Sequence, residues 1–73
     1  MIGELLERTF WKNFRGYTEA LDYPTHSAAI QAAKTFKIGA HSNDGMATVS
    51  SVDTGNTAIF VHYEWDYNYL RRR

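Results

Sequence analysis

Residues 25–38 (THSAAIQAAKTFKI) constrain the fold of this 73-residue chain more than any other stretch. The stretch contains four alanines, and alanine is the strongest helix former. One apolar stripe at helical spacing (i, i+3, i+4, i+7) consists of Ala29, Ala32, Ala33 and Phe36. The pattern predicts a helix over 25–38 whose small side chains allow it to pack closely against a sheet.

Residues on both sides of this stretch favour the same boundaries. Pro24 cannot continue a preceding helix, and Thr25 or Ser27 can cap the first free backbone N–H groups. Lys34 lies near the end of the stretch, where the helix dipole favours a cation. Gly39 can then adopt the left-handed conformation that often closes a helix.

The second half of the chain has the pattern of an antiparallel hairpin. Asn43-Asp44-Gly45 is typical of a turn, and Asp53-Thr54-Gly55-Asn56 predicts the connection between strands 46–52 and 57–67. The second strand alternates, and one face carries Ile59, Val61, Tyr63, Trp65, Tyr67 and Tyr69. The other face carries His62, Glu64, Asp66 and Asn68, with Phe60 as the apolar exception.

The N-terminal residues allow two interpretations. Residues 2–22 place apolar and charged side chains on opposite sides of one amphipathic helix, but Gly16 would cost its interior about 1 kcal/mol. Alternatively, a helix over 3–14 ends before a turn at Arg15-Gly16, and a strand follows over 17–22. We favour the second interpretation. The fold class is then α+β: one two-layer domain over 1–73, with helix 25–38 packed on the hairpin.

The size of the chain favours a protein that associates with another molecule. A domain this small has a core worth about 3–5 kcal/mol, and the chain has no cysteine with which to supplement it. Association with a partner protein or with a second copy is the remaining source of stability, so we expect a binding protein, with a homodimer as one form of it.

The charges are unevenly distributed although the net charge is zero. Residues 38–70 contain no Lys or Arg, and their acidic residues are Asp44, Asp53, Glu64 and Asp66. Either each charge keeps its own surface hydrated, or the hairpin presents an acidic surface to a basic partner.

The sequence contains no motif of an established catalytic chemistry. Phosphate-binding glycine loops, nucleophile elbows and zinc or calcium motifs are all missing. His26, His41 and His62 are scattered, and neither the His26-Ser27 pair nor His41 with Asp44 has the spacing of a catalytic or metal site. We therefore expect a non-enzymatic protein that needs no cofactor and no metal.

The last strand is longer than the helix that is expected to cover it. The helix would span about 20 Å and the strand about 45 Å. If Val52 pairs with Thr57, residues 65–70 extend beyond the hairpin without a partner strand. Trp65, Tyr67 and Tyr69 must then be covered by the N-terminal segment or by another molecule, or the strand must break. A strand edge that carries exposed Trp and Tyr is typical of an interface. We predict that at least one of Trp65, Tyr67 and Tyr69 is an interface anchor.

The candidate interface combines these aromatic residues with the nearby charges. It consists of Trp11, Tyr63, Glu64, Trp65, Asp66, Tyr67, Tyr69, Arg71, Arg72 and Arg73. The same aromatic side chains, with the arginine tail, would suit a nucleic-acid-binding accessory protein, which is the alternative. Glu64 and Asp66 on the aromatic strand disfavour a nucleic-acid groove.

Residues 14–38 (FRGYTEALDYPTHSAAIQAAKTFKI), followed by the hairpin, resemble small accessory proteins of bacteriophages and prophages. Those proteins combine a short strand, an alanine-rich helix with a Pro-Thr type cap, and a β-hairpin. The resemblance implies a viral protein that binds and inhibits a host defence or transcription complex, as anti-CRISPR proteins do. Such inhibitors share no functional residues, so none is transferred, and the mixed charge differs from that of a DNA mimic. With no membrane-length apolar run and no signal peptide, we expect the host cytoplasm.

Overall fold

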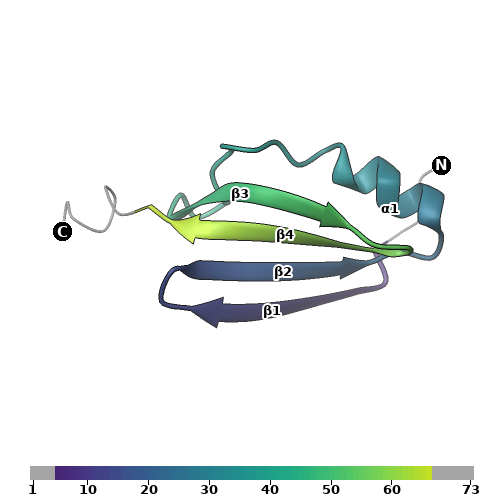
Figure 1. Cartoon of the computed structure of the whole chain (residues 1–73), viewed down its shortest axis with the longest axis horizontal. Coiled ribbons are helices and arrows are strands. Elements are labelled where there is room, and N and C mark those ends of the chain that lie inside the picture. Colours follow the sequence, from purple (N-terminus) through teal and green to yellow (C-terminus); the bar gives the residue numbers. More distant parts are fainter. Residues whose placement is uncertain (1–4, 67–73) are drawn as a thin grey trace.

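The computed structural model describes residues 5–66, which form a four-stranded antiparallel sheet and one helix (Figure 1). In chain order the elements are β1 Glu7–Asn13, β2 Gly16–Asp22, α1 His26–Ala33, β3 Ala47–Thr54 and β4 Ala58–Trp65. The strands lie in the order β1-β2-β4-β3. Strand β4 therefore lies between β2 and β3, and α1 lies in the connection between these two strands. The expected α+β class is confirmed.

The predicted N-terminal helix over 3–14 is wrong within the described residues, where β1 takes its place. Strand β1 pairs with β2 along its whole length, from Glu7 opposite Asp22 to Asn13 opposite Gly16. The Asn13 side-chain oxygen accepts the N–H groups of Arg15, at 2.8 Å, and Gly16, at 3.0 Å, and so holds the turn between the strands. The predicted strand over 17–22 is confirmed as β2.

Helix α1 begins as predicted but ends earlier than residue 38. Thr25 is the N-cap, and its hydroxyl accepts the N–H of Ala28 at 3.1 Å. After Ala33 the chain tightens, because Thr35 donates both its N–H, at 3.0 Å, and its hydroxyl, at 2.7 Å, to the Ala32 carbonyl. The chain then turns to follow β3, where the N–H of Gly39 donates to the carbonyl of Val49.

The β3–β4 hairpin is present, but its register differs from the predicted one. Thr54 lies opposite Ile59, and an irregularity between Val49 and Ser51 brings Ala47 opposite Trp65. The turn closes at Gly55, whose N–H donates to the Ala58 carbonyl at 2.8 Å. The predicted overhang is therefore wrong for Trp65, because β3 extends alongside it. The part of the predicted strand beyond residue 66 lies outside the described residues.

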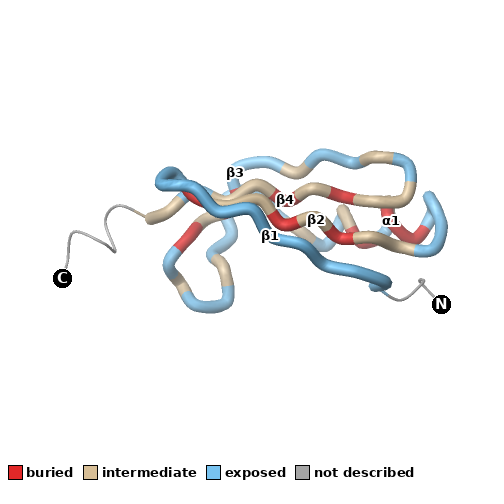
Figure 2. Tube along the Cα trace, turned by 90° about the horizontal axis from the view of Figure 1, so that it is seen from below, coloured by how far each residue is buried: buried red, intermediate tan, exposed pale blue. Residues whose placement is uncertain are grey.

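The predicted alternation of β4 is confirmed by its burial. Ile59 and Val61 are fully buried and pack against α1. The same buried cluster contains Leu21, Ala29, Ala32 and Val49. Buried positions occur along β2, β4 and α1, whereas β1 is exposed throughout (Figure 2). The sheet thus has one partly covered face, called here the helix face, and one open face.

At Gly16 the backbones of β2 and β4 lie too close together to leave room for a side chain. A Cβ atom on Gly16 would overlap the carbonyl oxygen of Tyr63 and lie 2.8 Å from the Cα atom of Glu64. Both neighbours are backbone atoms of the paired strand, so they cannot move aside without shifting the β2–β4 ladder.

We expect Gly16→Ala to lower the free energy of unfolding by about 2–3 kcal/mol, because the added methyl forces the central strands apart. Thermal unfolding should show the loss as a decrease in Tm of about 10 °C. Gly55→Ala is the matched control, because its Cβ would lie 3.3 Å from the nearest atom, a carbonyl oxygen. Equal losses in the two variants would contradict the importance of the Gly16 contact.

Candidate functional site

Helix α1 is too short to cover the helix face of the sheet. Its eight residues span about 12 Å, whereas the eight residues of β4 span about 26 Å. The start of α1 lies at the β3–β4 turn, where His26 Nδ1 is 2.6 Å from the carbonyl oxygen of Asn56 (Figure 1). The helix therefore covers the end of β4 nearest this turn, and Tyr63 and Trp65 lie beyond it.

The uncovered part of the helix face carries a cluster of aromatic rings. Tyr17 is at its centre and stacks on Tyr63 with ring centroids 4.4 Å apart. Trp65 tilts against Tyr17 at 5.4 Å, and Phe10 meets it edge-on at 5.9 Å. These rings come from β1, β2 and β4, at positions whose side chains share one face. The cluster forms an aromatic floor where the helix provides no cover.

Residues 35–44 form the wall opposite this floor. They follow the outer edge of β3, where Val49 donates to the Ala40 carbonyl at 2.9 Å and Ser42 donates to the Ala47 carbonyl at 2.8 Å. The predicted turn at 43–45 is confirmed: the N–H of Gly45 donates to the Ser42 carbonyl, and Gly45 has a positive φ of 76°.

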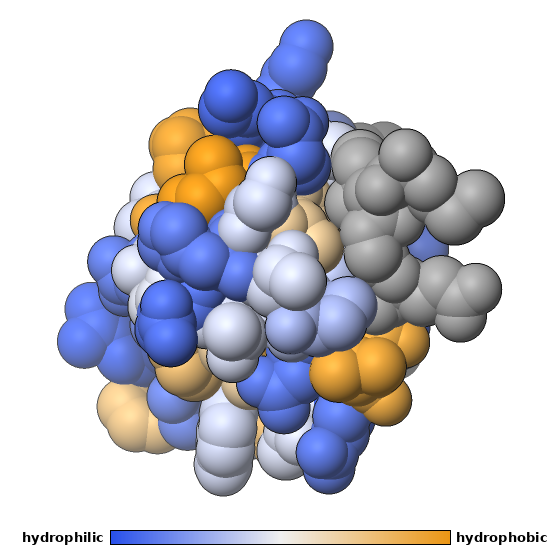
Figure 3. All heavy atoms as spheres, turned by 90° about the vertical axis from the view of Figure 1, so that its right-hand side faces the viewer, coloured by the Kyte–Doolittle hydropathy of each residue, from blue (hydrophilic) through white to orange (hydrophobic). Residues whose placement is uncertain are grey.

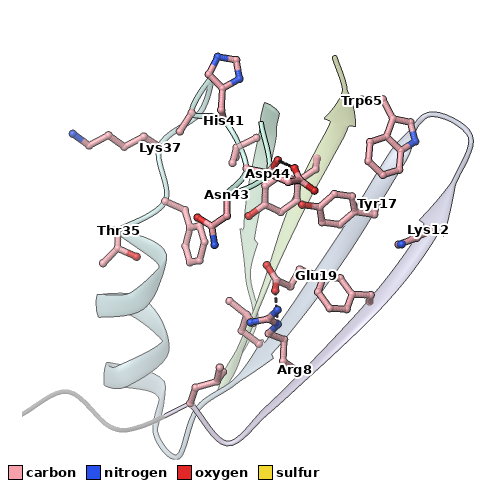
Figure 4. A pocket seen from close by; sticks show the side chains of 18 of the residues that line it. Arg8, Lys12, Tyr17, Glu19, Thr35, Lys37, His41, Asn43, Asp44 and Trp65 are labelled. Atoms are coloured by element: carbon pink, nitrogen blue, oxygen red, sulfur yellow. Dashed lines mark hydrogen bonds and ion pairs between the residues drawn. The ribbon is translucent and has the colours of Figure 1, made fainter. Parts of the chain in front are cut away.

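The floor and the wall enclose a concavity of about 720 Å³, called here the groove (Figure 4). Ten of its nineteen lining residues are apolar or aromatic and nine are polar or charged, so the lining is mixed. The groove is lined by Leu5, Arg8, Phe10, Lys12, Tyr17, Glu19, Leu21, Tyr23, Thr35, Phe36, Lys37, Ala40, His41, Ser42, Asn43, Asp44, Val49, Tyr63 and Trp65.

A buried carboxylate lies at the base of the groove. Glu19 is only 8% exposed, and Arg8 donates from Nε to its Oε2 at 2.7 Å (Figure 4). The Arg8 side chain is 53% exposed and its guanidinium carbon lies 5.1 Å from the centroid of the Phe10 ring. Arg8 of the edge strand β1 therefore forms an ion pair with a buried residue of β2, and its positive charge offsets the free-energy cost of burying the Glu19 carboxylate.

Three tyrosines have a raised pKa, chiefly because they are partly buried, and the Glu19 carboxylate contributes to each shift. Burial and then the Glu19 carboxylate raise the pKa of Tyr63 to about 12 and also raise that of Tyr23. The pKa of Tyr17 is raised mainly by burial, although its hydrogen bond with Ser42 acts in the opposite direction. The phenols therefore remain neutral in the physiological range, and the floor presents hydroxyl groups as well as ring surfaces.

The 42–44 turn brings a carboxylate to the mouth of the groove, near Tyr17 (Figure 4). Asp44 Oδ1 accepts from the Ser42 hydroxyl at 2.6 Å and from the N–H of Met46 at 2.9 Å. These hydrogen bonds, with a smaller contribution from the charge of Lys12, lower the pKa of Asp44. Lys12 and Asp44 thus place opposite charges on the two sides of the mouth.

The open face of the sheet carries a separate polar network. His62 Nδ1 lies 3.0 Å from the Thr18 hydroxyl, and His62 Nε2 lies 2.9 Å from Asp53 Oδ2. The network links β2, β4 and β3, and none of its members lines the groove. Its Asp53 carboxylate is 74% exposed, so this end of the network faces solvent.

The structure divides the predicted interface between two faces. Tyr63 and Trp65 lie in the groove, and Trp65 also donates from Nε1 to the Asn13 carbonyl at 3.0 Å. Trp11 and Glu64 alternate to the open face. Asp66 follows β4, and its N–H donates to the Met46 carbonyl. The predicted residues outside the described part of the chain are Tyr67, Tyr69, Arg71, Arg72 and Arg73.

The acidic hairpin surface, one of the two alternatives that the sequence left open, is not a single surface. Asp44 lies at the groove, whereas Asp53 and Glu64 belong to the open face. The alternation of β3 and β4 separates them, because neighbouring positions on a strand point to opposite sides of the sheet.

Sequence reasoning missed the groove residues of the first hairpin. Arg8, Phe10, Tyr17 and Glu19 were not selected as site residues, although all four line the groove. The sequence contained a signal for them: residues 8, 10 and 12 are every second residue, as are 17, 19 and 21, and every second residue of a strand points to the same face of the sheet. It was hidden by a helical pattern that fits residues 3–14 equally well.

Comparisons with family models, curated proteins and solved structures find no match for this chain. Within residues 5–66, no group of three or more His, Asp or Glu side chains is arranged to hold a metal ion. The single helix in that range lacks the length needed to cross a membrane.

We expect Arg8→Met to lower the free energy of unfolding by about 1–2 kcal/mol, because Glu19 then stays buried without its cation. The value is below that of a fully buried pair, since water reaches the exposed part of the arginine. Glu19→Gln is the partner variant, and the double variant should recover part of the loss in a denaturant double-mutant cycle. Additive single losses would contradict a direct coupling.

The raised pKa of Tyr63 predicts a loss of stability in alkali. The unfolded state ionises near pH 10 and the folded state near 12, so Tyr63 stabilises the fold below pH 10 and this contribution is lost as the pH rises to 12. Absorbance at 295 nm should show Tyr63 among the last of the five tyrosines to ionise, and Tyr63→Phe should remove that late phase. An unchanged late phase in this variant would assign the phase to another tyrosine.

Proposed function

We propose that this protein is a non-enzymatic binding module and that its groove holds a segment of a partner protein. The supporting observation is the aromatic floor of Phe10, Tyr17, Tyr63 and Trp65, which lies beyond the reach of α1. Tyrosine and tryptophan supply a large contact area and keep a polar group at the tip, so they dominate the energetically important positions of interfaces.

The charges of the groove support a protein partner over a nucleic acid. Arg8 is engaged with Glu19, and Asp44 stands across the mouth from Lys12. A nucleic-acid strand would meet the Asp44 carboxylate beside the stacking surface, and besides Arg8 the lining offers it only Lys12 and Lys37 as lysine or arginine cations. A polypeptide with both apolar and polar side chains fits the mixed lining better.

The resemblance to phage accessory proteins makes a host protein complex the partner class that we propose. On this hypothesis the protein inhibits the complex by direct contact in the bacterial cytoplasm. The size of the groove supports this mode of action, since about 720 Å³ accommodates a few side chains of a docked segment rather than a whole domain.

Phe10 and Trp11 provide the test, because they are neighbours on β1 and point to opposite faces. Both are exposed, at 47% and 55%, so truncation of either should leave the fold intact. The parent protein first captures its partner from bacterial lysate, and the dissociation constant of that complex is then measured for each variant. We expect Phe10→Ala to weaken binding by about 30-fold, the effect of losing an interface anchor of about 2 kcal/mol.

Trp11→Ala is the matched control and should bind within about twofold of the parent. Stronger loss in Trp11→Ala than in Phe10→Ala would assign recognition to the open face and contradict the groove. A captured nucleic acid, released by a modest increase in salt, would favour the alternative function.

A further inference from the structure

The two edge strands of the sheet, β1 and β3, differ in how far their outer backbone groups are hydrogen-bonded within residues 5–66. The edge of β3 is covered near its start by residues 39–42, through hydrogen bonds of Gly39, Ala40 and Ser42 with Val49 and Ala47. The outer edge of β1 has no neighbouring strand within residues 5–66. Unpaired N–H and C=O groups along a strand are a template for pairing with another chain.

Exposed apolar side chains are concentrated along this free edge. Among residues 5–66, seven large hydrophobic residues are exposed, and five of them lie between residues 5 and 14. The five are Leu5, Leu6, Phe10, Trp11 and Phe14. Figure 3 shows the end of the molecule that lies on the right in Figure 1, and there the hydrophobic residues, in orange, form separate patches with hydrophilic residues between them. All seven residues of β1 are exposed, and the two aromatic ones occupy its middle. Edge strands that avoid pairing usually carry charges or proline. In β1 the charges are Glu7, Arg8 and Lys12, and the centre of the strand, Thr9 to Trp11, is uncharged.

We propose that β1 pairs antiparallel with β1 of a second copy of this chain, around a two-fold axis at Thr9. An axis perpendicular to the sheet keeps the two faces continuous, so each residue meets a residue of its own face. Thr9 then faces Thr9, Arg8 faces Phe10, and Glu7 faces Trp11. No like charges are opposed, and each Arg8 meets an aromatic ring, a contact that it already makes with its own Phe10 at 5.1 Å.

The neighbouring registers fit less well. An axis at Phe10 would place Arg8 opposite Lys12 twice, and like charges directly opposite destabilise a sheet. An axis at Trp11 would extend the pairing past Asn13 into the turn. The Thr9 register instead uses the chain before β1, which continues beside β2, since the N–H of Leu6 donates to the Asp22 carbonyl at 2.7 Å.

This pairing would join two four-stranded sheets into one of eight strands. The groove floors of the two copies would lie on the same face of that sheet, with the two Phe10 side chains near the axis. The proposal goes beyond the binding function and does not rest on it, because it is argued from the β1 edge of a single copy as residues 5–66 show it.

The absence of cysteine allows a direct test with single cysteine variants of the purified protein. Facing residues of an antiparallel pair have Cα atoms about 4.5–5.5 Å apart, which suits a disulfide. Under a mild oxidant, Thr9→Cys should form a reducible covalent dimer at least about tenfold faster than Ser51→Cys. Ser51 is the matched control, because it is an exposed hydroxyl residue on the opposite edge strand, β3.

Phe10→Cys tests the register, since it would cross-link faster than Thr9→Cys if the axis were at Phe10. Thr9→Lys, studied by sedimentation without oxidant, should raise the dimer dissociation constant by about tenfold or more, because two lysines then face each other at the axis. A rate for Thr9→Cys no higher than that of Ser51→Cys or Phe10→Cys would overturn the proposal. These assays need no partner protein, so their failure is distinguishable from failure of the groove to bind one.

Discussion

The difference in length between α1 and the strands that it covers governs the rest of the structure. A helix gains 1.5 Å per residue and a strand about 3.3 Å, so an eight-residue helix covers less than half of an eight-residue strand. Where α1 covers β4, the side chains on the helix face of the strand are aliphatic, namely Ile59 and Val61. From Tyr63 onward the chain uses aromatic side chains, whose rings pack on one another and tolerate water at their polar edges.

The edge strand β1 connects this surface to the interior. Its Arg8 compensates Glu19, its Phe10 closes one side of the aromatic floor, and its Lys12 stands across the mouth from Asp44. The buried core within residues 5–66 is otherwise small, and four of its eight buried apolar residues are alanines. Association at the groove or at the β1 edge would therefore add to a modest intrinsic stability, since any molecule that binds only the folded state stabilises it.

Local physical chemistry determined several elements before any tertiary contact was considered. Thr25 caps α1 because its hydroxyl reaches a backbone N–H three residues later, a contact within one turn of chain. The turn at Asn43-Asp44-Gly45 and the strand over 17–22 followed from the same kind of local preference. The alternation of β4 also followed, because a period of two identifies the buried face without reference to its neighbours.

Tertiary structure decided what the local patterns left open. Residues 7–13 fit a helix and a strand alike, and pairing with β2 along the whole segment selects the strand. The path of the chain after α1 depends on the hydrogen bond from Gly39 to Val49 on β3, and the hairpin register depends on the irregular pairing of β3 with β4. The groove has the same origin: Tyr17 and Tyr63 are 46 positions apart, and only their neighbouring places on β2 and β4 stack them at 4.4 Å. Local propensity carries no information about such pairs, because their energy exists only once the strands have met.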